Sequence, residues 1–232
     1  TPANITIPKY TKFTTQVDSN TYTFSTDQRI TVSVDNDGRY VVEDLDLYEG
    51  EIVYEYFTVN SSNTSQRFVM SNKEADTSSI AVSVLTSSSD TTNAVYTHAL
   101  STIGLDGSSN VYFIVPAENQ KYEIQFGDGV IGNKPINGNI IEVVYRKSAG
   151  DLSNGANSFT IGTDDVPFPN TAITVVSTSK GGGVGESIEQ IKLNAPRSIS
   201  IQDRTITVSD YKTLLLQNFN DIETLHVYGG EE

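Results

Sequence analysis

The stretch SIAVSVL, from Ser79 to Leu85, decides the fold of this chain because its side chains alternate between apolar and polar. Ile80, Val82 and Val84 fall on one face of an extended strand, and the side chains between them fall on the other. A period of two residues is typical of a strand that is buried on one face. The stretch therefore predicts a half-buried β-strand.

Segments of the same kind run through the first three quarters of the 232-residue chain. The turn signal DNDG, Asp35 to Gly38, separates two of them, and the segment 111–117 is apolar on both faces, which predicts deep burial. The expected strands cover residues 29–34, 39–45, 51–59, 79–85, 92–100, 111–117, 121–126, 139–146, 158–161 and 172–177.

The pattern changes after Lys180, where the glycine-rich connector GGGVGES leads into two expected helices. The first covers residues 187–195 and ends before Pro196, because proline cannot continue a helix. The second begins at Thr207, a good N-cap residue, and the negative charge of Asp210 in its first turn suits the helix dipole.

A further strand is expected over 223–230, so the C-terminal part combines helices with a strand. The predicted fold is mainly β with a smaller α+β C-terminal part: antiparallel β-domains followed by a helix pair and a strand. We expect an N-terminal β region over 1–66, a β-domain over 67–180 and the C-terminal region over 181–232. Because the chain begins at Thr1 rather than Met and its last strand has no following partner, we expect a piece cut from a longer protein.

The composition excludes several classes of partner. The formal net charge is -14 and the pI is near 4.4, so the surface repels nucleic acid and anionic membranes. The chain has no cysteine, which excludes disulfides, thiolate metal sites and cysteine nucleophiles. No apolar run approaches the roughly 18 residues of a membrane span. We expect no nucleic-acid, membrane or small-molecule partner.

The candidate catalytic motifs each lack a required residue. The turn DNDG has no acid at Ser33, where a calcium loop needs one, and GGGVGES carries Glu186 where a phosphate loop needs lysine. The acids of Glu43–Glu51 fit a solvated face better than the facing carboxylates of a glycosidase. His98 and His226 have no companion motif. We therefore predict no catalytic, metal-binding or cofactor-binding residue, and no enzyme.

The stretch FGDGVIGNK, Phe126 to Lys134, has the glycine content of a phosphate cradle. A proline and a strand follow it rather than a helix, and Lys134 is a lone cation, so no helix N-terminus faces a ligand. We expect instead a glycine-dependent hairpin that joins the strands 121–126 and 139–146, with Asp128 capping a turn and the loop facing another subunit.

Several motifs follow one another over residues 120–217, and their order resembles that in the J-like baseplate wedge protein family of contractile-tailed bacteriophages. The family pattern combines F-G-D-G-x-x-G, a strand ending in Y-R, a glycine-rich connector, and N-A-P-R followed by Q-D-R-x-x-T-x-x-D-Y. The matching positions, whose role the resemblance implies to be architectural, are Phe126, Gly127, Asp128, Gly129, Gly132, Tyr145, Arg146, Pro196, Arg197, Asp203, Arg204, Thr207, Asp210 and Tyr211.

The resemblance implies a structural subunit of the tail baseplate of a virion, assembled in the host cytoplasm. Such a subunit associates with itself through homodimer contacts to form the inner baseplate ring. It also binds neighbouring wedge proteins and relays the conformational change that triggers sheath contraction. We expect Arg197 and Arg204 to pair with Asp203 or Asp210, and no cofactor to be required.

An alternative is a carbohydrate-binding or carbohydrate-cleaving β-module of a phage tail. It requires paired carboxylates in a cleft or an exposed aromatic platform. The 12 tyrosines permit such a platform, whereas the chain contains no tryptophan.

Overall fold

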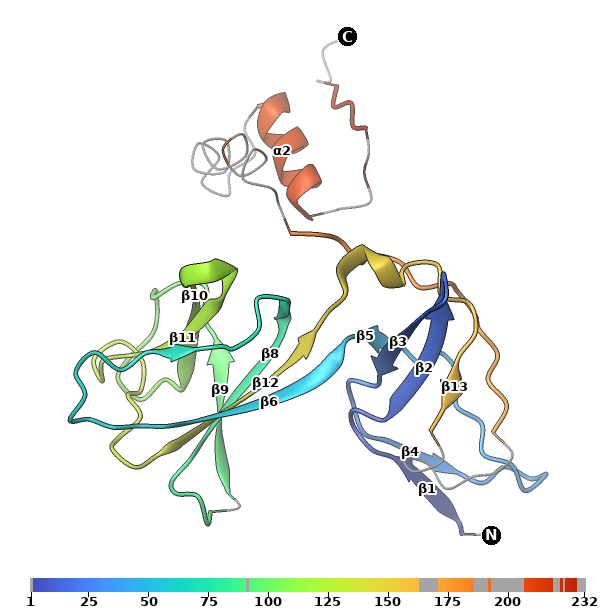
Figure 1. Cartoon of the computed structure of the whole chain (residues 1–232), viewed down its shortest axis with the longest axis horizontal. Coiled ribbons are helices and arrows are strands. Elements are labelled where there is room, and N and C mark those ends of the chain that lie inside the picture. Colours follow the sequence, from blue (N-terminus) through green and yellow to red (C-terminus); the bar gives the residue numbers. More distant parts are fainter. Residues whose placement is uncertain are drawn as a thin grey trace. The chain divides into compact units, whose positions relative to one another are not determined.

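The computed structural model describes residues 2–90, 92–162, 171–185, 192, 207–218, 222 and 224–228 (Figure 1). The protein is mainly β, with antiparallel sheets and a helix near the C-terminus, as the sequence predicts. The chain forms two compact units. The first consists of Thr1–Ala149 and Ser158–Val176, and the second of Gly150–Asn157 and Ser177–Glu232.

A seven-stranded sheet is the largest part of the first unit, and it curves into a nearly closed, barrel-like form (Figure 1). Neighbouring strands are antiparallel except for a short parallel pairing of β9 with β10. In spatial order the strands are β6 (Glu51–Thr58), β12 (Ile140–Lys147), β8 (Ala75–Leu85), β9 (Asn93–His98), β10 (Val111–Pro116), β11 (Tyr122–Phe126) and β7 (Phe68–Val69).

Side chains on the inner face of this sheet form the hydrophobic core. The alternation in β12 turns Ile141, Val143 and Tyr145 inward, and each of them is at most 1% exposed. Burial of one such aliphatic side chain stabilises the fold by about 1.5–3 kcal/mol. The buried members are Val59, Met70, Ala75, Ile80, Val82, Val84, Tyr96, Tyr112, Ile124, Ile141, Val143 and Tyr145.

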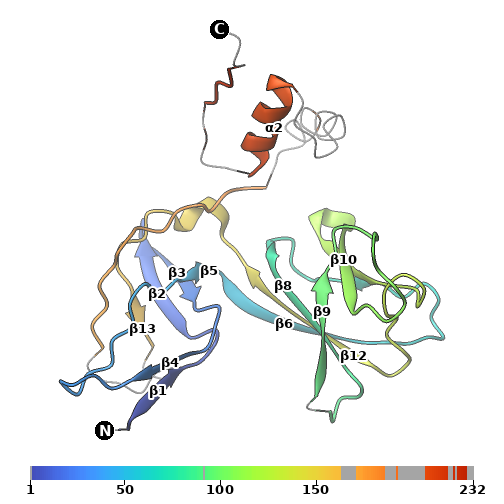
Figure 2. The ribbon, with the colours of Figure 1, turned by 180° about the vertical axis from the view of Figure 1, so that it is seen from behind.

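Two smaller sheets complete the first unit (Figure 2). In the four-stranded sheet, Asp18 and Ser19 join β2 to β3 with φ angles of 47° and 71°, the left-handed backbone that a two-residue hairpin turn requires. The strands, in spatial order, are β13 (Thr160–Ile161), β2 (Lys12–Val17), β3 (Asn20–Ser25) and β5 (Tyr48–Glu49), and separately β1 (Asn4–Ile7) paired with β4 (Ile30–Ser33).

The second unit contains the 3-10 turn η2 (Gly150–Ser153) and the helix α2 (Val208–Asn218). Another 3-10 turn, η1 (Glu118–Gln120), belongs to the first unit and links β10 to β11. The glycine-rich connector is anchored where it begins, because the backbone of Gly182 exchanges two hydrogen bonds with the side chain of Asn154. No helix in the described part of the chain is long and apolar enough to cross a membrane.

Several expected elements differ from the structure. The return strand over 39–45 does not form, because β4 pairs with β1 and the carboxylate of Asp35 holds the turn as an irregular loop. Residues 172–177 and the described residues 224–228 are not strands, and the strand expected over 158–161 is reduced to β13. The expected helix over 187–195 lies outside the described residues, except for position 192.

The expected regions and the expected burial of 111–117 also need correction. Because β6 pairs along its length with β12, the boundary between residues 66 and 67 divides a single sheet. In β10 only Val111 and Tyr112 are buried, and the next three residues are partly exposed, since this antiparallel sheet encloses its core on one face.

Candidate functional site

The loop that follows β11 is built on close backbone packing. Phe126, the last residue of β11, anchors it in the core, where its ring lies edge-on to Tyr96 with centroids 5.3 Å apart. At Gly127, a Cβ atom would lie 2.2 Å from the carbonyl oxygen of Gly132. Only glycine fits there, because real Cβ atoms do not approach backbone so closely.

Asp128 holds the tip of this loop. Its Oδ1 accepts hydrogen bonds from the backbone N–H groups of Val130 at 2.8 Å and Ile131 at 2.9 Å. The bonds from Ile131 and Val130 lower the pKa of the Asp128 carboxyl. Gly129 has a φ of 93°, and its N–H donates to Gly132 O at 3.0 Å. The turn cap expected at Asp128 is thus present.

A second loop, residues 99–110, interlocks with the first. Gly132 N–H donates to Asp106 O at 2.9 Å, and Asn133 N–H donates to Ser109 O at 2.7 Å. A Cβ atom on Gly107 would lie only 2.3 Å from the carbonyl oxygen of Gly129. We call residues 99–110 and 127–136 together the glycine loop pair.

Both members of the glycine loop pair expose aliphatic side chains. Single exposed aliphatic side chains are common on protein surfaces, whereas a group of them on adjoining loops is a candidate contact surface. The exposed fractions are 91% for Leu100, 90% for Ile103, 73% for Val130, 42% for Ile131 and 67% for Ile136.

The expected hairpin between the strands on either side of the FGDG loop is wrong. β11 pairs with β10 and β7, whereas β12 pairs with β6 and β8. The short connection 117–121 brings β10 to β11 at a lower cost in loop entropy than the longer excursion to β12. The glycine loop therefore crosses between distant strands of the sheet and is supported by the 99–110 loop.

Tyr145 and Arg146 point to opposite faces of β12, and both are buried. The Tyr145 hydroxyl donates to Glu55 and accepts from Asn72 Nδ2 at 2.6 Å. Burial raises the pKa of Tyr145, and the bond to Glu55 adds to this effect. The pairing of β12 with β8 shifts register at a bulge between Val144 and Arg146. There the Arg146 N–H donates to Ser79 Oγ at 2.8 Å.

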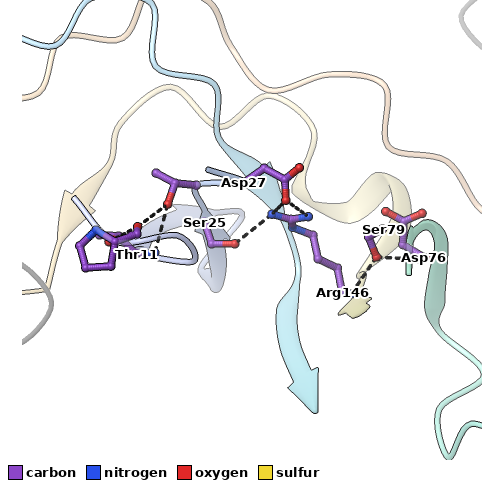
Figure 3. Close-up of polar contacts among 8 residues, drawn as sticks. Thr11, Ser25, Asp27, Asp76, Ser79 and Arg146 are labelled. Carbon is purple, nitrogen blue, oxygen red and sulfur yellow. Dashed lines mark hydrogen bonds and ion pairs between the residues drawn. The ribbon is translucent and has the colours of Figure 1, made fainter. Parts of the chain in front are cut away.

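The guanidinium of Arg146 joins the seven-stranded sheet to the end of β3 (Figure 3). Its Nη1 and Nη2 each lie 3.2 Å from Asp27 Oδ1, and Nη2 also reaches Ser25 Oγ at 3.4 Å. Its Cζ lies 5.2 Å from the ring centroid of Tyr48 and 5.8 Å from that of Tyr10. Tyrosine rings and one carboxylate thus hold this arginine, although its buried Nε has no hydrogen-bond partner.

The outer face of the seven-stranded sheet carries a row of hydrogen-bonded side chains that the sequence pattern does not predict. Tyr56 Oη donates to Glu142 Oε1 at 3.0 Å, and Ser83 Oγ donates to Glu142 Oε2 at 2.9 Å. Asn93 Nδ2 extends the row to Ser83 Oγ at 3.2 Å. The bond to Glu142 raises the pKa of Tyr56.

Tyr54 lies two residues before Tyr56 on the same face of β6, and the two side chains are 51% and 61% exposed. We call Tyr54, Tyr56 and Glu142 the tyrosine face. The alternation in EIVYEYFTV already places both tyrosines on one side, but the pairing that brings Glu142 beside them joins distant parts of the chain.

The acidic segment Glu43–Glu51 gives little support to a glycosidase. Glu49 Oε2 accepts from Ser148 Oγ at 2.7 Å, and its carboxylate also accepts the N–H of Ala149. Desolvation raises the pKa of Glu49. The carboxylate therefore holds the chain after β12, and Glu43, Asp44 and Asp46 are exposed on the preceding loop.

The described residues include no group of three or more His, Asp or Glu side chains that could hold a metal ion. His98 stacks on Tyr112 with ring centroids 5.4 Å apart, and His226 stacks on Tyr228 at 6.1 Å. Each histidine thus has an aromatic ring as a neighbour.

The C-terminal motif positions divide between described and undescribed residues. Thr207 Oγ1 accepts the N–H of Asp210 at 3.3 Å, and Asp210 Oδ2 accepts the N–H of Thr207 at 2.7 Å, which is a reciprocal cap of α2. Tyr211 is 48% exposed on this helix. The remaining positions, with the ion pairs expected of them, lie outside the described residues: Pro196, Arg197, Asp203 and Arg204.

No protein-family model matches the chain, and a search of curated proteins gives no match.

Proposed function

We propose that this protein is a structural subunit of a contractile-tail baseplate wedge in a phage virion. It associates with itself in the inner baseplate ring, binds neighbouring wedge proteins and relays the change that triggers sheath contraction. It is not an enzyme. The ordered motifs between Phe126 and Tyr211 support this role, because they resemble those of one family of such subunits.

One structural observation carries the proposal. The described motif residues have structural roles. The backbones of Gly127 and Gly132 are in close contact, Arg146 joins two sheets, and Thr207 caps a helix. The glycine loop pair, held by close backbone packing and by hydrogen bonds between its two loops, offers exposed aliphatic side chains for contact with a second copy.

Sedimentation velocity over a range of protein concentrations tests the self-association. We expect dimers or larger species at high concentration. The double variant Ile103→Ser, Val130→Ser should shift the equilibrium toward monomer, since both side chains are exposed on the glycine loop pair. Val176→Ser is the matched control, because Val176 is 83% exposed and lies outside the loop pair.

A strict monomer at every concentration would contradict the proposal. Binding on a glycan array that is lost when Glu43 and Glu51 are replaced by glutamine would instead support the carbohydrate-directed alternative.

A further inference from the structure

The tyrosine face offers recognition groups that the fold leaves accessible. Tyr54 and Tyr56 are about half exposed, although large aromatic side chains gain much from burial. Glu142 accepts one hydrogen bond on each oxygen, so each oxygen retains a lone pair for a further donor. A ligand that combines a positive charge with several N–H donors satisfies both kinds of group.

The molecule already uses this chemistry for one of its own side chains. The Arg146 guanidinium lies near the rings of Tyr10 and Tyr48 and pairs with the Asp27 carboxylate. The tyrosine face provides the same set of groups, two tyrosine rings and one carboxylate. They lie on the outer face of the neighbouring strands β6 and β12.

We propose that the tyrosine face binds an arginine side chain from a basic, extended segment of a partner protein. Charge complementarity favours this occupant, because the chain carries a net charge of -14 and a cation is attracted to both a carboxylate and an aromatic ring. Arginine suits the site better than lysine, since its planar guanidinium stacks on rings and donates in a fork to a carboxylate.

Lys9 limits where on the tyrosine face a second cation can bind. Lys9 Nζ lies 4.5 Å from the ring centroid of Tyr10, and the Tyr10 ring is edge-on to that of Tyr54 at 6.5 Å. A cation is therefore already present near Tyr54. We place the incoming arginine toward Tyr56 and Glu142, where repulsion from Lys9 is weaker.

The inference is independent of the proposed baseplate role, because it rests on the side chains of this face, on the net charge of the chain and on the Arg146 contacts, and on no family resemblance. It also differs from the self-association surface, since the glycine loop pair contributes none of them. Loss of one property therefore leaves the other measurable.

Fluorescence polarisation with labelled peptides on the full chain tests the inference. The probes are a flexible Gly/Ser peptide with two arginines and a peptide of the same length with citrulline, the neutral isostere, at both positions. We expect binding of the arginine peptide only. Glu142→Gln should weaken it about tenfold or more, the effect of losing one charged partner.

Matched variants separate recognition from general charge. Tyr54→Leu with Tyr56→Leu removes the rings and should also weaken binding, whereas Glu118→Gln on η1 and Tyr228→Ala, both at exposed positions, should not. Because Tyr56 is on the surface, its replacement keeps the inference testable even if Glu142→Gln fails to fold.

Equal binding of the citrulline peptide would overturn the inference, as would an unchanged affinity in the Glu142→Gln or the double tyrosine variant. The absence of any arginine-peptide binding would also overturn it. Binding of a neutral oligosaccharide such as xylohexaose, lost in the tyrosine variant while the peptides do not bind, would assign the face to carbohydrate instead.

Discussion

Gly127 and Gly129 are two residues apart, yet the structure requires glycine at each for a different reason. At Gly127 a side chain would strike the backbone of Gly132, whereas at Gly129 there is space for a Cβ atom but the φ of 93° strains any other residue. We expect Gly127→Ala to destabilise the protein by about 3 kcal/mol or more, and Gly129→Ala by about 1–2 kcal/mol.

Urea denaturation of both variants measures this difference. Gly183→Ala is the control, because nothing lies within 4 Å of a Cβ atom there and its φ is not in the left-handed region. Equal losses at positions 127 and 129 would show that the close backbone packing of the loop is not maintained.

The stability of the glycine loop pair should depend on pH through the carboxyl groups of Asp106 and Asp128. Hydrogen bonds lower both pKa values below the ordinary 3.8: chiefly from the Ser108 side chain to Asp106, and from the Ile131 and Val130 N–H groups to Asp128. Because the folded state favours the charged carboxylates, their stabilising effect is full above pH 3.8 and is lost as pH falls through the lower folded values.

We therefore expect Asp128→Asn to lower the melting temperature at pH 7 and to cost progressively less below pH 3.8, where the wild-type carboxyl also becomes neutral. Calorimetry of the two proteins across this range measures the effect. A difference that does not change with pH would mean that the charge of Asp128 contributes nothing to the loop.

Among the elements, β12 provides an ion pair between the seven-stranded sheet and the end of β3. The Arg146 side chain is 6% exposed and that of Asp27 is 51% exposed. Water can therefore hydrate Asp27 when the arginine is removed, but it cannot hydrate Arg146 when the aspartate is removed. We expect Asp27→Ala to destabilise the protein by about 2 kcal/mol, because it leaves a buried guanidinium without its carboxylate. Arg146→Met should cost less, since it removes the buried charge and the remaining Asp27 is hydrated.

Chemical denaturation of both variants, with Asp37→Ala as an exposed control, tests this asymmetry. A larger loss for Arg146→Met would show that packing on Tyr10 and Tyr48, rather than charge, is the main contribution of the arginine.

The sequence predicted strands better than it predicted their partners. The alternation in β6 and β12 depends on neighbouring residues, so the expected bounds of these two strands lie within one residue of the observed bounds, whereas β8 begins four residues earlier than expected. The pairing of β6 with β12 depends on chain segments that are far apart, and local pattern does not encode it.

In the candidate site, too, local contacts were predictable from the sequence and long-range contacts were not. Asp128 and Thr207 cap turns and helices within three residues of themselves, and both caps were predicted from spacing. The burial of Arg146 and the placement of Glu142 beside Tyr56 arise only from sheet register, so spacing could not reveal them.

For the whole molecule, net charge should act in opposite directions on the two proposed interactions. Copies that each carry -14 repel one another, so self-association should strengthen as salt screens that repulsion. Binding of a basic peptide to the tyrosine face should weaken over the same range, because salt screens an attraction. Sedimentation and polarisation measured between 50 and 300 mM salt, over which the Debye length falls from roughly 14 Å to roughly 6 Å, test both signs.

If both interactions respond to salt in the same direction, one of them depends on something other than charge. An unchanged self-association would indicate that the contact between copies lies far from the acidic surface.

The position of β12 between β6 and β8, with Arg146 near its end, has a mechanical consequence. A pull along this strand loads its hydrogen bonds to both neighbours in shear, so many must break together. Force that enters through Asp27 passes by way of Arg146 into β12, which is paired on both sides. The barrel-like sheet should thus be stiff along β12 and yield first where β9 meets β10 or β11 meets β7, since each of these pairings has only two register pairs.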